Sequence, residues 1–507
     1  MTFRISIASV VLLAILGCVG PIPDIQDEMV EMRDDVGLAT DVYFPEEQDE
    51  NAFPVLLVRT PYDKTFLSFA SITYTQQGIA VVTQDLRGRS KSEGVDMIFT
   101  TDGDGDLKDG YDTFQWIDDQ SWSNDKVVSW GASALGMVQY VSAPTDPPGL
   151  QAMLPTVATP RFYEHGVFHG GVFRHSMVTL WLEAQGSEHF FDSIDAHPYL
   201  DDFWDPVQPA QAFDQVNVPV LHVGGWYDIF PQGPIDAFVG YQHEGGAGAV
   251  GQQKLIMGPW THSGVGLRPQ GQLIYPLEST TPPVTVNEAT QAFIAEYLDP
   301  ANPTSNLAVE DIPIVQYYVM GDVLDAQAPG NEWRTADDWP PAAAPVRMHL
   351  QADGTLDEAC ADGAIETTDY VYDPADPSPT ACGGNLLIAA GPCDQTAIEA
   401  RDDVRVFETP VLTEPMEITG RVKAHIFVDL DQPDTDVMVR MTDVYPDGPT
   451  CTRTGAPCSS PTARPGSRRG VAPPASPRSP PGRSSRWWWT CSAPVSSSPP
   501  GTDCGSR

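Results

Sequence analysis

The sequence predicts an α/β protein in which a mostly parallel sheet, covered by helices on both faces, is followed by a β-sandwich. The first observation is that apolar, strand-like runs alternate with helical runs between residues 34 and 300, as in sheets built from β-α-β units. The second is that the hydrophobic period changes to two after about Trp339, with frequent turn residues, which indicates a sandwich. The chain has 507 residues, enough for two or three domains.

The elements expected in the sheet follow one another along the chain. Strands are predicted at 36–44, 53–58, 79–84, 127–130, 150–157, 218–223 and 254–257. Helical spacing of apolar residues occurs at 109–119, 134–141, 234–242 and 287–297. Residues 161–216 interrupt this rhythm, because they are rich in aromatic residues and histidine, with helical stretches such as 177–183 and no clear buried strand. We therefore expect a sheet domain in two parts, 24–160 and 217–335, with 161–216 inserted as a helical cap.

Charge and the N-terminus limit the partners and the location of the protein. The chain carries 69 acidic and 28 basic residues, a formal net charge of −41, which argues against binding to nucleic acid or anionic membranes.

Arg4, the largely apolar run 5–16 and Cys18 have the order of an export signal that is too short to span a bilayer. The run before Cys18 resembles a bacterial lipobox, so residues 1–18 are expected to be a signal peptide of lipoprotein type with Cys18 lipid-anchored. The alternative is an ordinary signal peptide cut nearby, and both place the mature chain outside the cytoplasm, in the cell envelope or secreted.

A serine lies between a predicted strand and a predicted helix. The stretch Lys126–Gly136 reads KVVSWGASALG, with Ser133 flanked by small residues. A serine on such a turn is typical of the nucleophile elbow of α/β-hydrolases, in which the hydroxyl must stand clear of a crowded backbone. The usual spacing is Gly-x-Ser-x-Gly, and here the second glycine, Gly136, comes one residue late.

Two further predicted strands end in residues that complete a catalytic set. The strand 218–223 runs into Gly-Gly-Trp-Tyr-Asp228, and the strand 254–257 runs into Gly-Pro-Trp-Thr-His262. Chemistry in open α/β sheets collects at the carboxyl ends of strands, so Ser133, Asp228 and His262 are expected at one edge. Their order along the chain is that of α/β-hydrolases, which predicts Ser133 as nucleophile, His262 as general base and Asp228 as its orienting acid.

These segments together resemble the cocaine-esterase-like CocE/NonD hydrolases, a family that includes α-amino-acid ester hydrolases, glutaryl-cephalosporin acylases and X-Pro dipeptidyl-peptidases. The resemblance covers roughly residues 32–448. It rests on MRDDVGLATDVYFP, LLVRTPYDK, QDLRGRSKSEG, DGYDTFQWI, SWSNDKVVSWGAS, GGWYDIF, GPWTHS, YVYDPADPSPT and TDVYPDG. It implies an α/β-hydrolase core, an inserted helical cap and a C-terminal jelly-roll. It also implies an oxyanion hole formed by the phenol of Tyr62 and the backbone N–H of Ala134.

Two departures from the family bear on the substrate. Related enzymes usually carry tyrosine directly after the nucleophile, whereas this chain has Ala134. In α-amino-acid ester hydrolases, acidic residues soon after the triad acid help to bind the substrate ammonium. Here Ile229, Phe230 and Pro231 follow Asp228. The sequence therefore weakens the case for substrates with a free amine, without excluding them.

Two groups of residues resemble metal ligands and are set aside. Asp102, Asp104 and Asp106 begin like a calcium loop, but the sixth and twelfth positions lack the required glycine and glutamate, so a solvated acidic turn is favoured. His165 and His169 lie four residues apart beside Glu164, but the HEXXH pattern is absent. No metal or other cofactor is expected.

Three cysteines lie in the β-rich region: Cys360, Cys382 and Cys393. A disulfide is plausible in an exported protein. Cys382 with Cys393 closes the shortest loop and is the favoured pair, although the other pairings stay open.

The jelly-roll is expected over 336–449 and is expected to be incomplete. Its strands are predicted at 346–350, 370–372, 405–409, 416–419, 422–428 and 437–441. From Cys451 onward the composition changes: the only acid is Asp503, lysine is absent, and Pro, Ser and Arg dominate. Because the strand pattern ends abruptly inside a domain that the family continues, we expect a frame change near the codon for Thr450, with 450–507 as a disordered, low-complexity tail. A genuine basic tail is the alternative.

The sequence as a whole predicts an exported serine hydrolase that cleaves ester or amide bonds through an acyl-enzyme. The substrate is expected to be a small-molecule ester, an amide or a short peptide. An X-Pro dipeptidyl-peptidase is the alternative among enzymes. An inactive secreted binding protein that kept the fold is the alternative of another class. The sequence does not define the oligomeric state.

Overall fold

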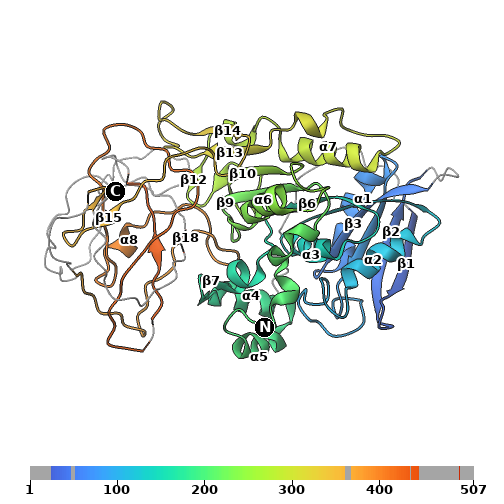
Figure 1. Cartoon of the computed structure of the whole chain (residues 1–507), viewed down its shortest axis with the longest axis horizontal. Helices are drawn as coiled ribbons and strands as arrows, with labels where there is room; N and C mark the ends of the chain where they lie inside the picture. The colour runs from blue at the N-terminus through green and yellow to red at the C-terminus, as the bar shows by residue number, and fades with distance from the viewer. Residues whose placement is uncertain (1–23, 47–51, 360–366, 434, 445–489, 492–507) are drawn as a thin grey trace, which may run out of the picture.

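The computed structural model describes residues 24–46, 52–359, 367–433, 435–444 and 490–491. The predicted signal peptide with Cys18, the residue Cys360 and nearly all of the predicted tail lie outside these ranges. A ten-stranded sheet organises the chain (Figure 1). Its strands, in spatial order, are β1 (Asp24–Glu31), β2 (Gly37–Phe44), β4 (Ala80–Asp85), β3 (Phe53–Thr60), β5 (Ser123–Ala132), β6 (Leu150–Thr156), β9 (Leu221–Tyr227), β10 (Lys254–Thr261), β13 (Val315–Val319) and β14 (Glu332–Ala336).

The centre of the sheet is parallel and its margins are antiparallel. Neighbouring strands from β4 through β13 pair in parallel, whereas β1 with β2, β2 with β4, and β13 with β14 pair antiparallel. Each parallel strand except β13 was predicted from its apolar run, whereas the strand predicted at 36–44, β2, pairs antiparallel with both of its neighbours. The acidic strand β1 (DIQDEMVE) was not predicted, because it has no apolar alternation and is mostly exposed. Pairing along the whole length of β2 makes it a strand.

Helices cover both faces of the sheet, and alternate strand residues point to opposite layers. Val55 and Leu57 of β3 pack in the cluster that contains Phe114 of α2 (Asp109–Asp118). Leu56 between them packs in the cluster that contains Phe293 of α7 (Val286–Leu298). Contacts with the sheet are also made by α1 (Ser68–Thr75), α3 (Ala134–Ser142) and α6 (Gly233–Glu244). This two-sided burial explains why the central strands read as continuous apolar runs.

The residues predicted as a cap, 161–216, fall between β6 and β9 and are called the cap segment below. They begin with a π-helical turn (Phe162–Val167) and a short hairpin of β7 (Phe168–His169) and β8 (Val172–Phe173). The helices α4 (His175–Gln185) and α5 (Phe191–Ala196) follow, with several 3₁₀ turns. Their apolar side chains share one core cluster with α3, so the segment is packed against the sheet domain. In Figure 1 it lies below the sheet, beside α3.

The C-terminal segment, defined here as residues 336–449, differs from the strand pattern predicted for it. Its strands in the described residues are β15 (His349–Leu350), β16 (Leu356–Asp357) and β17 (Val439–Arg440), and its helix is α8 (Thr396–Glu399). β15 pairs with β16, and β17 pairs with β18 (Thr490–Cys491). Four predicted strands were wrong in secondary structure: 370–372, 405–409, 416–419 and 422–428. Alternation marks which side of an extended segment is apolar, but a strand forms only where a partner supplies hydrogen bonds.

Candidate active site

Ser133 occupies a strained turn between β5 and α3. Its backbone lies at φ 59° and ψ −125°, a conformation that costs a non-glycine residue about 1–3 kcal/mol. A Cβ at Gly131 would lie 2.4 Å from the Cβ of Leu135, and one at Gly136 would lie 2.7 Å from the Cβ of Ala158. Both positions therefore need glycine, even though the second comes one residue later than in the usual elbow.

A chain of hydrogen bonds links Ser133 to His262 and Asp228. The distance from Ser133 Oγ to His262 Nε2 is 2.8 Å, and His262 Nδ1 lies 2.5 Å from Asp228 Oδ1. The same carboxylate oxygen accepts a 2.7 Å hydrogen bond from the backbone N–H of Ile229. Asp228 is fully buried and His262 is nearly so. Because the carboxylate accepts from Nδ1–H, Nε2 is left to accept the serine proton.

The sheet brings these residues together from distant parts of the sequence. Ser133 follows β5, Asp228 follows β9, and the adjacent strand β10 leads into His262. All three strands run parallel, so their carboxyl ends meet at one edge. The prediction that the three side chains share this edge follows from that topology, and the structure places them in hydrogen-bond contact.

Tyr62 and Ala134 lie beside the serine. Tyr62 follows β3, and its phenol oxygen accepts a 3.1 Å hydrogen bond from the indole N–H of Trp181. Burial raises the pKa of Tyr62 above its ordinary value, while hydrogen bonds to Trp181 and to Ser133 lower it. Ala134 is the first residue of α3, and the first N–H groups of a helix have no acceptor within the helix. The phenol hydrogen of Tyr62 and the backbone N–H of Ala134 are thus two groups beside Ser133 that can donate a hydrogen bond.

The surroundings of Asp228 are apolar on one side and include an arginine on the other. Ile229 and Phe230 are buried, and the Phe230 ring stands edge-on to the His262 ring at 5.8 Å. The guanidinium of Arg174, at the start of α4, donates to the carbonyls of Ile229 (2.9 Å) and Gly384 (3.0 Å). Burial lowers the pKa of Arg174 to about 10, opposed by the charge of Asp228.

The C-terminal segment contacts the loop of Asp228 through a disulfide-closed turn. Cys382 and Cys393 are joined, as the favoured pairing predicted. Within this turn, a Cβ at Gly384 would lie 2.5 Å from the carbonyl oxygen of Asp228. The C-terminal segment therefore packs directly against the backbone of a candidate catalytic residue.

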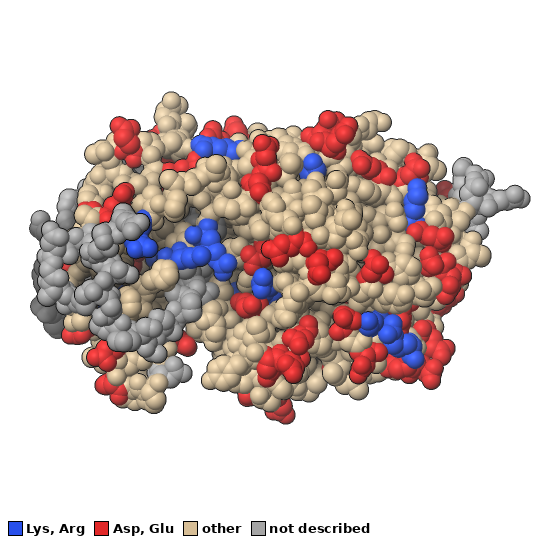
Figure 2. All heavy atoms as spheres, in the orientation of Figure 1, with Lys and Arg blue, Asp and Glu red and all other residues tan. Residues whose placement is uncertain are grey.

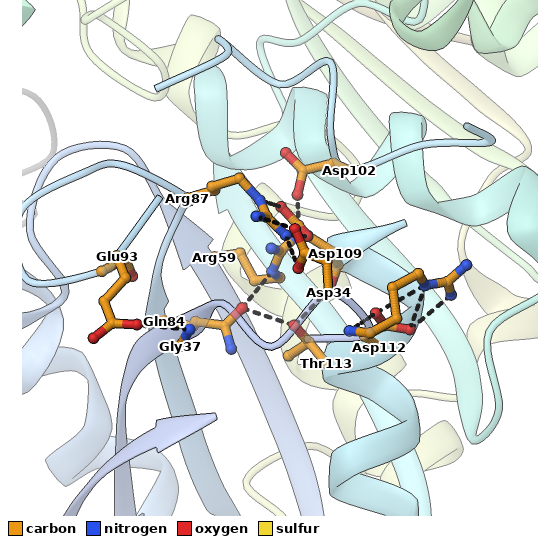
Figure 3. Close-up of polar contacts among 12 residues, drawn as sticks. Asp34, Gly37, Arg59, Gln84, Arg87, Glu93, Asp102, Asp109, Asp112 and Thr113 are labelled. Atoms are coloured by element: carbon orange, nitrogen blue, oxygen red, sulfur yellow. Dashed lines mark hydrogen bonds and ion pairs between the residues drawn. The ribbon is translucent and has the colours of Figure 1, made fainter. Parts of the chain in front are cut away.

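The prediction of a solvated acidic turn at 102–106 is wrong for its first member. Asp102 is buried and forms an ion pair with Arg59, whereas Asp104 and Asp106 are exposed. Arg59 also donates to Gln84 at 2.7 Å, and Figure 3 shows this group beside the Arg87–Asp109 pair. The sequence shows three similar aspartates, and only the packing distinguishes the one that faces a buried arginine.

The two histidines weighed as metal ligands lie at the start of the cap segment. His165 is buried, with Nδ1 2.8 Å from the hydroxyl of Thr159. Burial lowers the pKa of His165 well below its ordinary value and that of His169 to about 4. Within the described ranges, no group of three or more His, Cys, Asp or Glu side chains is arranged to hold a metal ion.

Sequence reasoning missed three residues at the site: Trp181, Arg174 and Arg89. Arg89 lies in the QDLRGRSKSEG stretch, so its position in a resembling motif was a usable signal. Trp181 and Arg174 lie in the cap segment, where nothing in the one-dimensional pattern indicates which side chains turn toward the sheet.

The charges on the surface agree with the net negative charge of the sequence, which argues against binding to nucleic acid or anionic membranes. Acidic side chains are spread over the face drawn in Figure 2, and basic side chains are few. In the described part of the chain, no helix has the length and apolar character needed to cross a membrane.

An α/β sheet with a serine at such an elbow places the protein among the serine hydrolases. Residues 34–191 and 179–264 match the X-Pro dipeptidyl-peptidase (S15) family, and residues 307–471 match the X-Pro dipeptidyl-peptidase C-terminal non-catalytic domain. The chain is 32% identical to the cocaine esterase of Rhodococcus sp. over 83% of its own length and 80% of that protein. The chain therefore belongs to the cocaine-esterase-like CocE/NonD hydrolases of the X-Pro dipeptidyl-peptidase superfamily, as its motifs predicted.

More distant relatives agree with the fold. A putative serine esterase of Mycobacterium bovis is 22% identical over 83% of this chain and 78% of that protein. A solved α-amino acid ester hydrolase superposes with a TM-score of 0.63 at 23% identity, covering 81% of this chain and 77% of that one. An aminopeptidase from a Thaumarchaeota archaeon gives 0.61 at 22% identity, covering 84% and 75%. The second family match ends at residue 471, inside the tail 450–507 that was predicted to follow a frame change near the codon for Thr450.

Proposed function

We propose that the protein is an exported serine hydrolase that cleaves ester or amide bonds through an acyl-enzyme, with Ser133, His262 and Asp228 as its catalytic triad. The observation that carries the proposal is the hydrogen-bond chain from Ser133 Oγ through His262 to Asp228 Oδ1, with links of 2.8 and 2.5 Å. A nucleophile bonded to a base, and the base bonded to an orienting acid, is the arrangement that activates a hydroxyl.

The proposed reaction proceeds in two stages. Ser133 Oγ attacks the substrate carbonyl carbon as its proton passes to His262 Nε2, and Asp228 stabilises the imidazolium. The oxyanion accepts hydrogen bonds from the phenol of Tyr62 and the backbone N–H of Ala134. His262 returns the proton to the leaving oxygen or nitrogen, and the acyl group stays on Ser133. Water, deprotonated by His262, then releases the acid and restores the serine. The residues themselves supply the chemistry, so the proposal includes no metal or cofactor.

The serine is tested by labelling with a fluorophosphonate probe. Ser133→Ala should abolish labelling and lower kcat by about 10⁶, and His262→Ala should reduce both severely. Ser129→Ala is the matched control, because this buried serine lies on the same strand but bonds to Gln139. Full esterase activity in Ser133→Ala would refute the triad. An unlabelled wild-type protein would favour the inactive binding protein.

A separate substitution tests the proposed oxyanion hole. Tyr62→Phe removes one donor and little volume, so kcat should fall by about 10² with a smaller change in KM. An unchanged kcat would make Tyr62 a packing residue only.

The substrate class is the less defined part of the proposal. Buried Ile229 and Phe230 follow the triad acid where an ammonium-binding enzyme carries acids, which favours acyl groups without a free amine. The family match to X-Pro dipeptidyl-peptidases supports the alternative. Rates measured on aryl esters, acyl amides and Xaa-Pro anilides separate the two substrate classes. An X-Pro dipeptidyl-peptidase should cleave the Xaa-Pro anilides, whereas an esterase or acylase should prefer the aryl esters or acyl amides.

Export is proposed from residues 1–18, with Cys18 as the lipid attachment site. The test is metabolic labelling with a fatty acid followed by cell fractionation. Cys18→Ala should lose the label and leave the membrane fraction. A cytoplasmic wild-type protein would overturn the proposal, whereas an unlabelled protein outside the cytoplasm would support an ordinary signal peptide.

A further inference from the structure

A cap tryptophan contacts the residue proposed to stabilise the oxyanion. Trp181 on α4 donates its indole N–H to the phenol oxygen of Tyr62 at 3.1 Å. The two rings stand edge-to-face with centroids 6.4 Å apart, and Trp181 also packs on Phe99 at 6.1 Å. Trp181 is thus held by aromatic packing with its single polar hydrogen directed at Tyr62.

The contact with Trp181 limits the direction in which the Tyr62 phenol can donate its own hydrogen. An indole N–H can only donate, and a phenol has one hydrogen to give and two lone pairs to accept with. Because Tyr62 accepts from Trp181, its own hydrogen is directed elsewhere. Ser133 and the Tyr62 phenol lie within hydrogen-bond reach of each other. Because Trp181 does not use the phenol hydrogen, that hydrogen is free to be donated to the oxyanion that develops beside the nucleophile, and a hydroxyl that accepts one hydrogen bond donates the next more strongly.

One guanidinium joins the two segments that make this contact. Arg89 Nε donates to the carbonyl of Pro61 at 3.1 Å, next to Tyr62. Its Nη1 donates to the carbonyl of Gln185, the last residue of α4, at 2.9 Å. Nη1 also pairs with Asp96 at 2.9 Å. Arg89 thus fixes the end of the cap helix to the loop that carries the proposed oxyanion donor.

We propose that Trp181 is a positioning residue that directs the Tyr62 phenol into the oxyanion hole, so that the hole is complete only when α4 is seated on the sheet domain. This inference rests on the proposed function and extends it. The cap segment then acts on the chemical step. Removing the indole N–H should lower kcat with little effect on KM, because a directed donor matters most when negative charge develops on the oxyanion.

A double-mutant cycle tests this role. Trp181→Phe should lower kcat by about tenfold, the scale of one hydrogen bond, with KM changed less than about threefold. In the Tyr62→Phe background the same change should cost almost nothing, because no phenol remains to direct. An equal loss of kcat in both backgrounds would overturn the proposal and leave Trp181 as a packing residue, as would an unchanged kcat in Trp181→Phe.

An arylboronate provides a second readout, because its adduct with Ser133 places an oxygen in the oxyanion hole. Its affinity should fall about tenfold in Trp181→Phe and stay unchanged when Trp181→Phe is added to Tyr62→Phe. Trp204→Phe is the matched control: this buried cap tryptophan donates to the carbonyl of His197 at 3.0 Å. Its effect on kcat should be the same with and without Tyr62.

Two further measurements distinguish a failure of this inference from a misfolded variant and from a failure of the proposed function. If Trp181→Phe does not fold, Arg89→Lys replaces it: losing the forked contacts should lower kcat, and the loss should vanish in the Tyr62→Phe background. A loss that persists there overturns the inference. Fluorophosphonate labelling of Ser133 in the wild type decides the proposed function independently. A labelled, active enzyme in which Trp181→Phe has wild-type kcat contradicts the inference alone.

Discussion

The sheet domain and the C-terminal segment use apolar residues in opposite ways. Every residue of β2 and β4 is buried, and the side chains alternate between two helix-covered layers. In the C-terminal segment, Val411 is 91% exposed and Phe427 is 76% exposed. Residues 421–427 even alternate between exposed and half-buried, as a strand would, yet no ladder forms there.

The difference shows what a hydrophobic pattern requires in order to become structure. In the sheet domain most connections are helices that fold back onto the strands they join, so one side of many apolar runs is covered by a nearby segment; the other side can be covered from far along the chain, as Leu56 is by α7. A sandwich strand depends instead on a second sheet from distant segments. Where those partners are missing from the described residues, the apolar side of the same alternation stays only half-buried.

The largest expected effect tests the buried charges of the sheet domain. Asp102→Asn should lower the free energy of unfolding by about 3–5 kcal/mol, because it leaves the buried Arg59 without its counter-charge. Asp104→Asn, two residues away, is the control. Asp104 is 62% exposed in its ion pair with Lys108, so a change below about 0.5 kcal/mol is expected. Urea unfolding measures both, and equal effects would contradict the burial of Asp102.

A pair of phenylalanines tests the comparison directly. Phe293 on α7 is fully buried, so Phe293→Ala should cost about 3–5 kcal/mol. Phe427→Ala should change stability by less than about 0.5 kcal/mol, since an exposed ring loses little contact. A large loss in Phe427→Ala, seen as a lower urea midpoint, would mean that the C-terminal segment has a closed core in solution.

The disulfide is the next largest expected effect. Replacing Cys382 and Cys393 by serine removes a link across 11 residues, which should cost about 2–3 kcal/mol. Because Gly384 packs on the Asp228 carbonyl, kcat should also fall modestly. Thermal unfolding and kinetics on the oxidised protein check both. Unchanged activity would show that the turn stabilises the C-terminal segment without helping to position Asp228.

The smallest effect concerns His222 on β9, whose buried side chain lies between Tyr140 and Gln253. Burial lowers the pKa of His222 to about 3, so the unfolded chain binds a proton at higher pH than the folded chain does. The contribution of neutral His222 to the free energy of unfolding is therefore fully present above pH 6.5 and is lost as the pH falls. At pH 5 the loss amounts to about 2 kcal/mol. His222→Gln should remove this part of the pH dependence. His425→Gln, at an exposed position, should leave it unchanged; an equal flattening in both would contradict the assignment.

Most of the candidate site was predicted from sequence, and the reason is local. Ser133, Asp228 and His262 each directly follow a recognisable apolar strand, and parallel strands bring their carboxyl ends to one edge. Tyr62 came from a motif shared with the family. Trp181 could not be predicted, because its role depends on how α4 packs against the loop that follows β3. The buried ion pair of Asp102 depends on a side chain more than 40 residues away.

By itself, the sequence determined the parallel core, the order of the site residues and the family, because these depend on short-range periodicity and on chemistry attached to strand ends. Only the tertiary structure decided which aspartate is buried, which cap side chain reaches Tyr62, and which predicted strands of the C-terminal segment find partners. Those outcomes depend on contacts between distant segments. The sequence pattern predicts which face of each segment is apolar, but it does not predict which other segment covers that face.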